Sequence, residues 1–307
     1  MFSVIFPGQG SQFVGMTKDL YNNYTYIKDL FKLADEILGY SITKIILEGS
    51  KEELDLTQNT QPAIFISSFS IFEMIKRESK LKLSDAKYLA GHSLGEYSAL
   101  AAAGSLDFEI ALKLLNERGK AMQTSVPKGT GGMLAVLGAD IEEISGLLYE
   151  NKNKYKCYIA NDNSNGQIVL SGLNSDIEKI INDLKSKNIK NIKLPVSAPF
   201  HCELMSKATF HMKDKILNAK FKKPKNIIIS NVTGSETQEV DEIKKLLIQQ
   251  IESPVRWRES VVYMIKNGVT NFIEIGPGKV LSGLIKRIDK TVKINTINKF
   301  EDISEIA

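Results

Sequence analysis

A chain of 307 residues, 43% hydrophobic and 25% charged, is long enough for one large domain or two unequal ones. Its net charge of +4 comes from 40 basic residues scattered among 36 acidic ones, which gives no indication of nucleic-acid binding. No apolar run could span a bilayer, and no basic segment or cleavage site opens the chain, so we expect a cytoplasmic protein without membrane contact. Cys157 and Cys202 form no CxxC and no metal-ligand spacing, which fits a reducing compartment and predicts no metal site.

The first predicted element is a short apolar strand, Ser3–Phe6, followed by PGQGSQ at 7–12. Its glycines indicate a sharp turn at the carboxyl end of a strand, where open α/β sheets bind ligands. Gly8, Gly10 and Gly15 do not have the spacing of a dinucleotide fingerprint. A tight loop without function is the alternative. Two helices are predicted next, Tyr24–Leu38 and Gln61–Lys76, the second with Pro62 at its first helical position.

The stretch LAGHSLGEYSALAAA at 89–103 carries a G-x-S-x-G match centred on Ser93. An apolar run precedes it and good helix formers follow, which is the strand, turn and helix context of a nucleophile elbow. Gly91 and Gly95 leave room for a strained turn that exposes the hydroxyl, and the following helix directs its free N–H groups toward it. A glycine-rich connection without chemistry remains the alternative.

A helix is predicted from an N-cap at Asp107 to about Gln123, with Arg118 inside its apolar face. A guanidinium on a core-facing stripe requires an anion. That anion can be a carboxylate of the protein, the commoner outcome, or the carboxylate of a substrate, gripped by two parallel hydrogen bonds.

After a linker over 126–132, the pattern changes to strand, helix, two strands, helix and strand. This βαββαβ order in about seventy residues is typical of a ferredoxin-like unit, inserted here in the larger domain. A cleft between two domains is a common place for a substrate. The strands are Met133–Leu137, Cys157–Ala160, Gln167–Ser171 and Ile189–Pro195, and the helices are Ile141–Asn151 and Asp176–Lys187.

The chain has three histidines, so the search for a general base is short. His92 follows a strand directly before Ser93 and should point to the opposite side. His211 lies in a lysine-rich helical stretch and is most simply a surface residue. His201, in PVSAPFHCELM at 195–205, is the best candidate by elimination, although a lone histidine is more often structural.

The last third returns to alternating strands and helices, which favours a parallel sheet covered on both faces. Pro254 cannot continue a helix, so it should end the predicted helix at Glu242–Ile251. The predicted elements are a strand at Ile227–Ser230, a helix at Glu242–Ile251, a strand at Asn271–Ile275 and a helix at Lys279–Ile288.

Six motifs in order together resemble the stand-alone bacterial malonyl-CoA:acyl carrier protein transacylase family, over essentially the whole chain. They are PGQGSQ (7–12), GHSLGEYSAL (91–100), NERGKAMQ with Arg118, PVSAPFHCELM (195–205), QQIESPVRW (249–257) and EIGPGKVLSGLIKRI (274–288). The resemblance implies a large α/β-hydrolase-like domain with a parallel sheet over 1–126 and 199–307. It also implies an inserted ferredoxin-like domain over 127–198, and we expect a monomer.

The resemblance also implies a role for each matching residue. Ser93 matches the nucleophile, His201 its base and Arg118 the residue that holds the malonyl carboxylate. The matching oxyanion-hole donors are the backbone N–H groups of Gln9 and Leu94. The remaining matches are Gln250, whose carbonyl orients the histidine, the polar cleft residues Asn161 and Asn163, and Phe200, which resembles the malonyl-selecting version of its position.

The implied reaction moves a malonyl group from malonyl-CoA to the phosphopantetheine thiol of an acyl carrier protein that binds transiently. It requires no permanently bound cofactor. An esterase or thioesterase is the main rival, although the GQG loop, Arg118 and the inserted domain have no natural explanation there. A non-catalytic protein that binds the carrier is a third hypothesis. Cys202 is not favoured as a nucleophile, because sequence neighbours rarely present sulfur and imidazole to one another.

Overall fold

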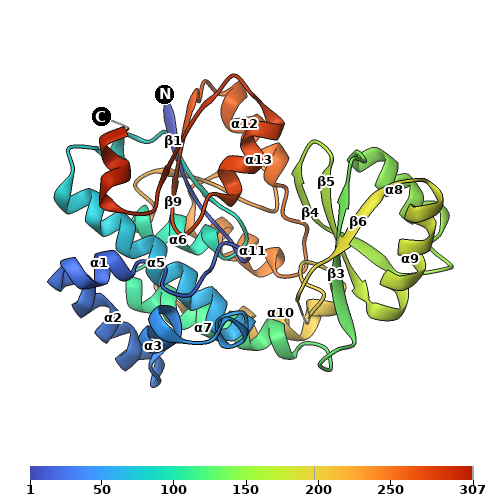
Figure 1. Cartoon of the computed structure of the whole chain (residues 1–307), viewed down its shortest axis with the longest axis horizontal. Helices are drawn as coiled ribbons and strands as arrows, with labels where there is room; N and C mark the ends of the chain where they lie inside the picture. Colours follow the sequence, from blue (N-terminus) through green and yellow to red (C-terminus); the bar gives the residue numbers. More distant parts are fainter. Residues whose placement is uncertain (197, 306–307) are drawn as a thin grey trace.

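The computed structural model describes residues 1–196 and 198–305; Ser197, within the 195–205 motif, lies outside the described residues. Two sheets organise the described chain (Figure 1). The larger has the order β10-β9-β1-β2-β7-β8 and is parallel except for β8. Its strands are β1 (Phe2–Phe6), β2 (Tyr88–Gly91), β7 (Ile227–Ile229), β8 (Glu236–Thr237), β9 (Asn271–Ile275) and β10 (Lys293–Ile297).

The second sheet is antiparallel, with the order β4-β5-β3-β6. It is formed by β3 (Gly131–Leu137), β4 (Cys157–Ser164), β5 (Gln167–Leu173) and β6 (Lys190–Lys193). Helices α8 (Ile141–Glu150) and α9 (Asn174–Ser186) pack on it, and the sheet with its helices stands to one side of the larger sheet in Figure 1. The prediction of a mixed α/β chain with a parallel sheet is confirmed, and the antiparallel sheet is separate from it. We call the antiparallel sheet with α8 and α9 the smaller unit, and the parallel sheet with the other helices the large unit.

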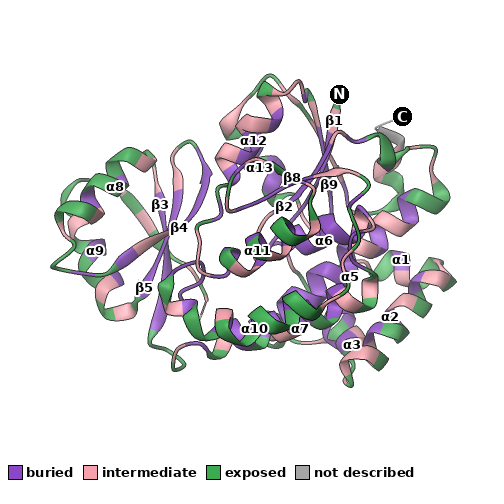
Figure 2. Cartoon of the chain, turned by 180° about the vertical axis from the view of Figure 1, so that it is seen from behind, coloured by how far each residue is buried: buried purple, intermediate pink, exposed green. Residues whose placement is uncertain are grey.

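Alternation along the strands gives the large sheet two apolar faces. Val4 and Phe6 of β1 pack in one core with the helices of the first half, whereas Ile5 packs in another with α12 and α13. Figure 2 shows the buried residues on the strands and on the inner faces of the helices. The helices of the large unit are α1 (Lys18–Asn23), α2 (Thr25–Leu38), α3 (Ile42–Glu48), α4 (Lys51–Leu54), α5 (Thr57–Glu78), α6 (Gly95–Ala102), α7 (Phe108–Thr124), α10 (Ser206–Asn218), α11 (Val240–Gln250), α12 (Trp257–Lys266) and α13 (Val280–Ile288). The 3₁₀ turns among the described residues are η1 (Leu83–Asp85), η2 (Glu203–Met205) and η3 (Phe300–Glu305).

One predicted helix start is corrected by about one turn, and the predicted N-cap of α7 is confirmed. Helix α5 begins at Thr57, one turn before Pro62, because a proline near the start of a helix removes only one hydrogen bond and the preceding turn is anchored by the Thr60 hydroxyl on the Leu54 carbonyl. Asp107 does occupy the N-cap of α7, but its carboxylate makes no capping bond and pairs instead with Lys222 at 2.8 Å. In the part of the chain that is described, no helix is both long and apolar enough to cross a membrane.

Candidate active site

Ser93 lies in a tight turn between β2, which ends at Gly91, and α6, which begins at Gly95. The turn is strained, because Ser93 has φ of 53° in the left-handed region. Only glycine fits beside it, since a Cβ on Gly91 would lie 1.9 Å from the Gly95 carbonyl carbon. The local sequence therefore dictates the geometry that presents this hydroxyl.

The Ser93 hydroxyl meets the His201 ring, 108 residues away in the chain, with Oγ 2.8 Å from Nε2. The other ring nitrogen, Nδ1, lies 2.9 Å from the backbone oxygen of Gln250. A carbonyl can only accept, so Nδ1 carries the proton and Nε2 is left to accept the Ser93 proton. His201, like Ser93, has a positive φ, 60°.

His201 is neutral at ordinary pH. Burial, followed by the positive charge of Arg118, lowers the pKa of His201 to about 3. A neutral imidazole whose Nε2 faces a hydroxyl can act as a general base. Arg118, whose charge adds to the effect of burial, lies beside the nucleophile.

Arg118 projects from α7 into the site and is only 1% exposed. Its terminal nitrogens donate to the side-chain oxygens of Gln61 and Gln250, both at 2.8 Å, and to Ser93 Oγ at 3.2 Å. Among the described residues no carboxylate lies at ion-pair distance from the guanidinium, and its Nε has no hydrogen-bond partner. Of the two alternatives for this arginine, an internal ion pair is therefore excluded, and the buried cation is available to an anion from outside.

The backbone N–H groups of Gln9 and Leu94 are candidates to bind the negative charge of an oxyanion. Gln9 and Leu94 follow β1 and β2, which are paired in parallel so that Phe6 lies opposite Gly91. Within the residues that the structure describes, neither N–H has a hydrogen-bond partner, and both residues line the cavity beside Ser93. Unpaired donors next to a nucleophile are the arrangement of an oxyanion hole.

The site is a cavity of about 140 Å³ between the two units. This is well below the 300 Å³ or more of a site for a whole drug-sized ligand, so it fits a short acyl group. The smaller unit contributes Asn161 and Asn163 from β4, which are 6% and 8% exposed. Phe200, 6% exposed, also lines it. The structure thus brings together all nine residues singled out in the sequence.

The other two histidines do not contact Ser93 Oγ. His92 was expected to point away, yet it lines the same cavity, where its Nε2 lies 2.8 Å from Asn163 Oδ1. It therefore connects the elbow to the smaller unit. His211 is exposed on α10, where its ring lies 3.2 Å from the Glu117 carboxylate.

Sequence reasoning missed a buried polar layer under the site. Asn231, fully buried after β7, accepts from the Ser93 N–H at 2.6 Å and donates to the Gly91 carbonyl at 2.7 Å. Glu96 accepts from the Asn231 N–H and from the Gln250 side chain, at 3.1 and 2.7 Å, and burial raises the pKa of Glu96 to about 7. The one sequence signal for this layer was Asn231, a polar residue directly after a predicted buried strand.

Comparisons with known proteins agree with this geometry. The family described as "Acyl transferase domain" matches residues 3–301. A malonyl CoA-acyl carrier protein transacylase of Bacillus subtilis is 43% identical over 303 residues, covering 97% of this chain and 94% of that protein. The crystal structure of an acyl-carrier-protein S-malonyltransferase from Bartonella henselae superposes with a TM-score of 0.96 at 38% identity, covering 99% and 98% of the two chains. A malonyl-transacylase in complex with its type II PKS acyl-carrier protein has a TM-score of 0.94 at 36% identity, covering 99% and 97%.

Proposed function

The chain belongs to the acyl transferase family, and on that premise we propose that it moves a malonyl group from malonyl-CoA to acyl carrier protein through an ester on Ser93. It is an acyltransferase of the malonyl CoA-acyl carrier protein transacylase type, and its product supplies fatty acid or polyketide synthesis. The observation that carries the Ser93 mechanism is the 2.8 Å contact between Ser93 Oγ and His201 Nε2. Beside it lies the buried Arg118 guanidinium, which has no carboxylate at ion-pair distance among the described residues.

The first half-reaction forms the ester. As Ser93 Oγ attacks the thioester carbonyl, His201 Nε2 takes the hydroxyl proton. The N–H groups of Gln9 and Leu94 hold the tetrahedral oxyanion, each contributing about 3 kcal/mol to lowering the barrier. The intermediate collapses, the carbon–sulfur bond breaks, and coenzyme A leaves as a thiol with the proton from His201.

The second half-reaction transfers the group to the carrier. The phosphopantetheine thiol gives its proton to His201 and attacks the ester carbonyl, and the Ser93 oxygen leaves and recovers that proton. Thioester is exchanged for thioester, so the overall reaction is near balance. Water competes with the thiol, and the small buried cavity favours the positioned thiol.

Selectivity rests on the substrate carboxylate. A malonyl group on Ser93 offers two oxygens to Arg118, whose hydrogen bonds to Gln61 and Gln250 fix the plane of the guanidinium. An acetyl group would leave the cation without its counter-charge. Asn161, Asn163 and Phe200 also line the cavity that would hold the acyl group.

The Ser93 ester is tested by intact-mass analysis of the whole chain. Exposure to malonyl-CoA should add one malonyl group, and later addition of phosphopantetheinylated acyl carrier protein should remove it and label the carrier. Rapid release of malonate without a carrier would instead assign the chain to hydrolysis. A protein that binds the carrier but never acquires an acyl group would be the non-catalytic alternative.

We also propose that residues 1–126 and 199–307 form an α/β-hydrolase-like domain and residues 127–198 an inserted ferredoxin-like domain. The strand-turn-helix at Ser93 supports the first, and the antiparallel order β4-β5-β3-β6 with two crossover helices supports the second. We propose further that the enzyme is a cytoplasmic monomer without a permanently bound cofactor. Size-exclusion chromatography with light scattering tests the monomer.

The pH dependence of ester formation should reflect the lowered pKa of His201. The base works only when neutral, so kcat/KM for malonyl-CoA should fall on acidification near pH 3 rather than near the ordinary 6.5. Rates from pH 8 down to the acid limit of folding measure this. Arg118→Met removes the second cause of the shift and should move the inflection upward. An inflection at 6.5 in the unaltered enzyme would contradict this electrostatic account.

Asn231 is predicted to position the elbow. Asn231→Ala removes two hydrogen bonds at 2.6 and 2.7 Å and leaves the Ser93 N–H and Gly91 carbonyl unsatisfied. We expect kcat for ester formation to fall about 10²-fold with little change in KM, because small displacements of a nucleophile are costly. Stability should fall by about 1–3 kcal/mol for each orphaned group. Asn295→Ala, which breaks a 2.9 Å side-chain bond to Asn271 between β9 and β10, is the control and should keep kcat.

A further inference from the structure

A second cavity, of about 900 Å³, opens in the large unit. Its walls are the second half of α5, the loop over 79–86, the segment that joins α6 to α7, and Lys225 with Asn226 before β7. Its floor is the sheet, at Val4 and Leu89. No described residue lines both this cavity and the one at Ser93. The volume lies in the range of sites for small molecules.

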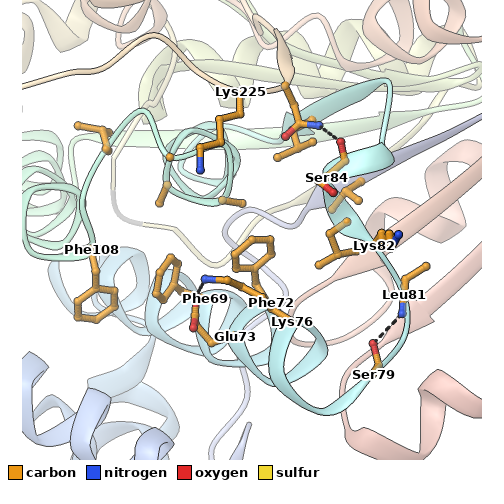
Figure 3. Close-up of a pocket in the computed structure, with 18 of the residues that line it drawn as sticks. Phe69, Phe72, Glu73, Lys76, Ser79, Leu81, Lys82, Ser84, Phe108 and Lys225 are labelled. Atoms are coloured by element: carbon orange, nitrogen blue, oxygen red, sulfur yellow. Dashed lines mark hydrogen bonds and ion pairs between the residues drawn. The ribbon is translucent and has the colours of Figure 1, made fainter.

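The inner wall of this cavity is aromatic. Phe69, Phe72 and Phe108 are partly buried, with ring centroids 6.0 Å apart for Phe69 and Phe72 and 5.1 Å apart for Phe69 and Phe108. Figure 3 shows Phe69 and Phe72 on α5 facing the Lys225 side chain, which reaches toward them from the opposite wall. Aromatic rings that face water inside a cavity favour the binding of an apolar ligand.

The rim has an excess of positive charge. The two acidic residues of the lining are already paired, Glu73 with Lys76 at 3.1 Å and Asp107 with Lys222 at 2.8 Å. The other three lysines of the lining, Lys80, Lys82 and Lys225, have no ion pair or hydrogen bond from their ammonium groups within the described residues. The rim is therefore complementary to an anion.

The loop that forms the outer wall is held in place. Asn226 donates from Nδ2 to the carbonyls of Ser84 and Ala86, at 3.0 and 2.8 Å, and the Leu81 N–H donates to Ser79 Oγ at 3.2 Å. The last of these bonds and that to Ser84 are drawn in Figure 3. A cavity with fixed walls needs little ordering when a ligand enters, which favours binding.

We propose that this cavity binds a straight-chain fatty carboxylate, with its tail on the phenylalanines and its head group near Lys225, Lys80 and Lys82. A neutral apolar ligand would leave the three lysine ammonium groups without a counter-charge. A small polyanion would leave the three phenylalanine rings exposed to water. One anionic head on a long apolar tail satisfies both. The proposal is independent of the chemistry at Ser93.

Equilibrium dialysis of the whole chain against laurate and dodecyltrimethylammonium, below their micelle concentrations, tests this. The two probes have straight tails that differ by only about one methylene, and their head groups differ in the sign of the charge. Laurate should bind and the cation should not, and each methylene removed from the carboxylate should weaken binding by up to about fourfold. Absence of laurate binding, or equal binding of both probes, would overturn the proposal.

Substitutions of lysines test whether laurate binds in this cavity. The triple variant Lys80→Met, Lys82→Met and Lys225→Met should weaken laurate about tenfold, because each exposed charge contributes modestly. The matched control changes three other exposed lysines, Lys207, Lys213 and Lys220, to Met and should leave binding unchanged. These lysines form no ion pair with any residue that the structure describes. Arg118→Met should also leave it unchanged. Equal binding by the triple variant, or loss of binding in Arg118→Met, would refute this site.

Discussion

Ser93→Ala is expected to abolish the malonyl ester and to lower carrier-dependent malonyl transfer by about 10⁴-fold or more. Alanine keeps the tight turn but has no oxygen to attack the thioester, so His201 has no proton to remove. Transfer rates with saturating malonyl-CoA and carrier, together with intact mass, measure the loss. Binding of the carrier should survive, because the substitution removes one atom from a buried cavity.

A matched serine separates chemistry from structure in this experiment. Ser98, five residues later on α6, is 1% exposed, and its hydroxyl has no hydrogen-bond partner among the described residues. Ser98→Ala should therefore retain full activity. His201→Ala combined with Ser93→Ala should be no slower than Ser93→Ala alone, because the two groups act as one unit. A malonyl adduct that persists in Ser93→Ala would place the nucleophile elsewhere.

Arg118→Met is expected to lower ester formation from malonyl-CoA by about 10²- to 10⁴-fold while relatively sparing acetyl-CoA. Each hydrogen bond between the guanidinium and the malonyl carboxylate contributes about 1.5–3 kcal/mol, and two are lost. An acetyl group makes neither bond, and without the arginine it no longer leaves a buried charge unpaired. Methionine retains most of the apolar stem. The ratio of kcat/KM for malonyl-CoA to that for acetyl-CoA is the measurement.

The control for this selectivity is a cation on the same helix. Lys113 is exposed on α7 and pairs with Glu109, outside the cavity, so Lys113→Met should leave the ratio unchanged. Equal losses for malonyl and acetyl transfer in Arg118→Met would remove the selectivity role. In that case Arg118 would serve only to hold Gln61 and Gln250 in place.

Much of the fold could be predicted from local pattern. The glycines around Ser93 predict a strained turn, and alternating strands and helices predict the parallel sheet, because both depend on neighbours in the chain. The start of α5 was misplaced by one turn, since the signal from Pro62 was weaker than the tertiary anchoring of the preceding residues. The strand β8 has two residues, too few to carry a pattern, and α12 and β10 were also not predicted.

The sequence by itself determined the type of most elements, the exposed turn at Ser93, the scarcity of histidines and the family resemblance. Only the tertiary structure decided that Arg118 meets amide oxygens instead of an internal carboxylate. It also decided that the pKa of His201 falls to about 3, and that Asn231 and Glu96 lie beneath the nucleophile. The physical reason is that hydrogen bonds and charge interactions depend on distance and burial, and a hydrogen bond in this site joins residues 157 positions apart in the chain.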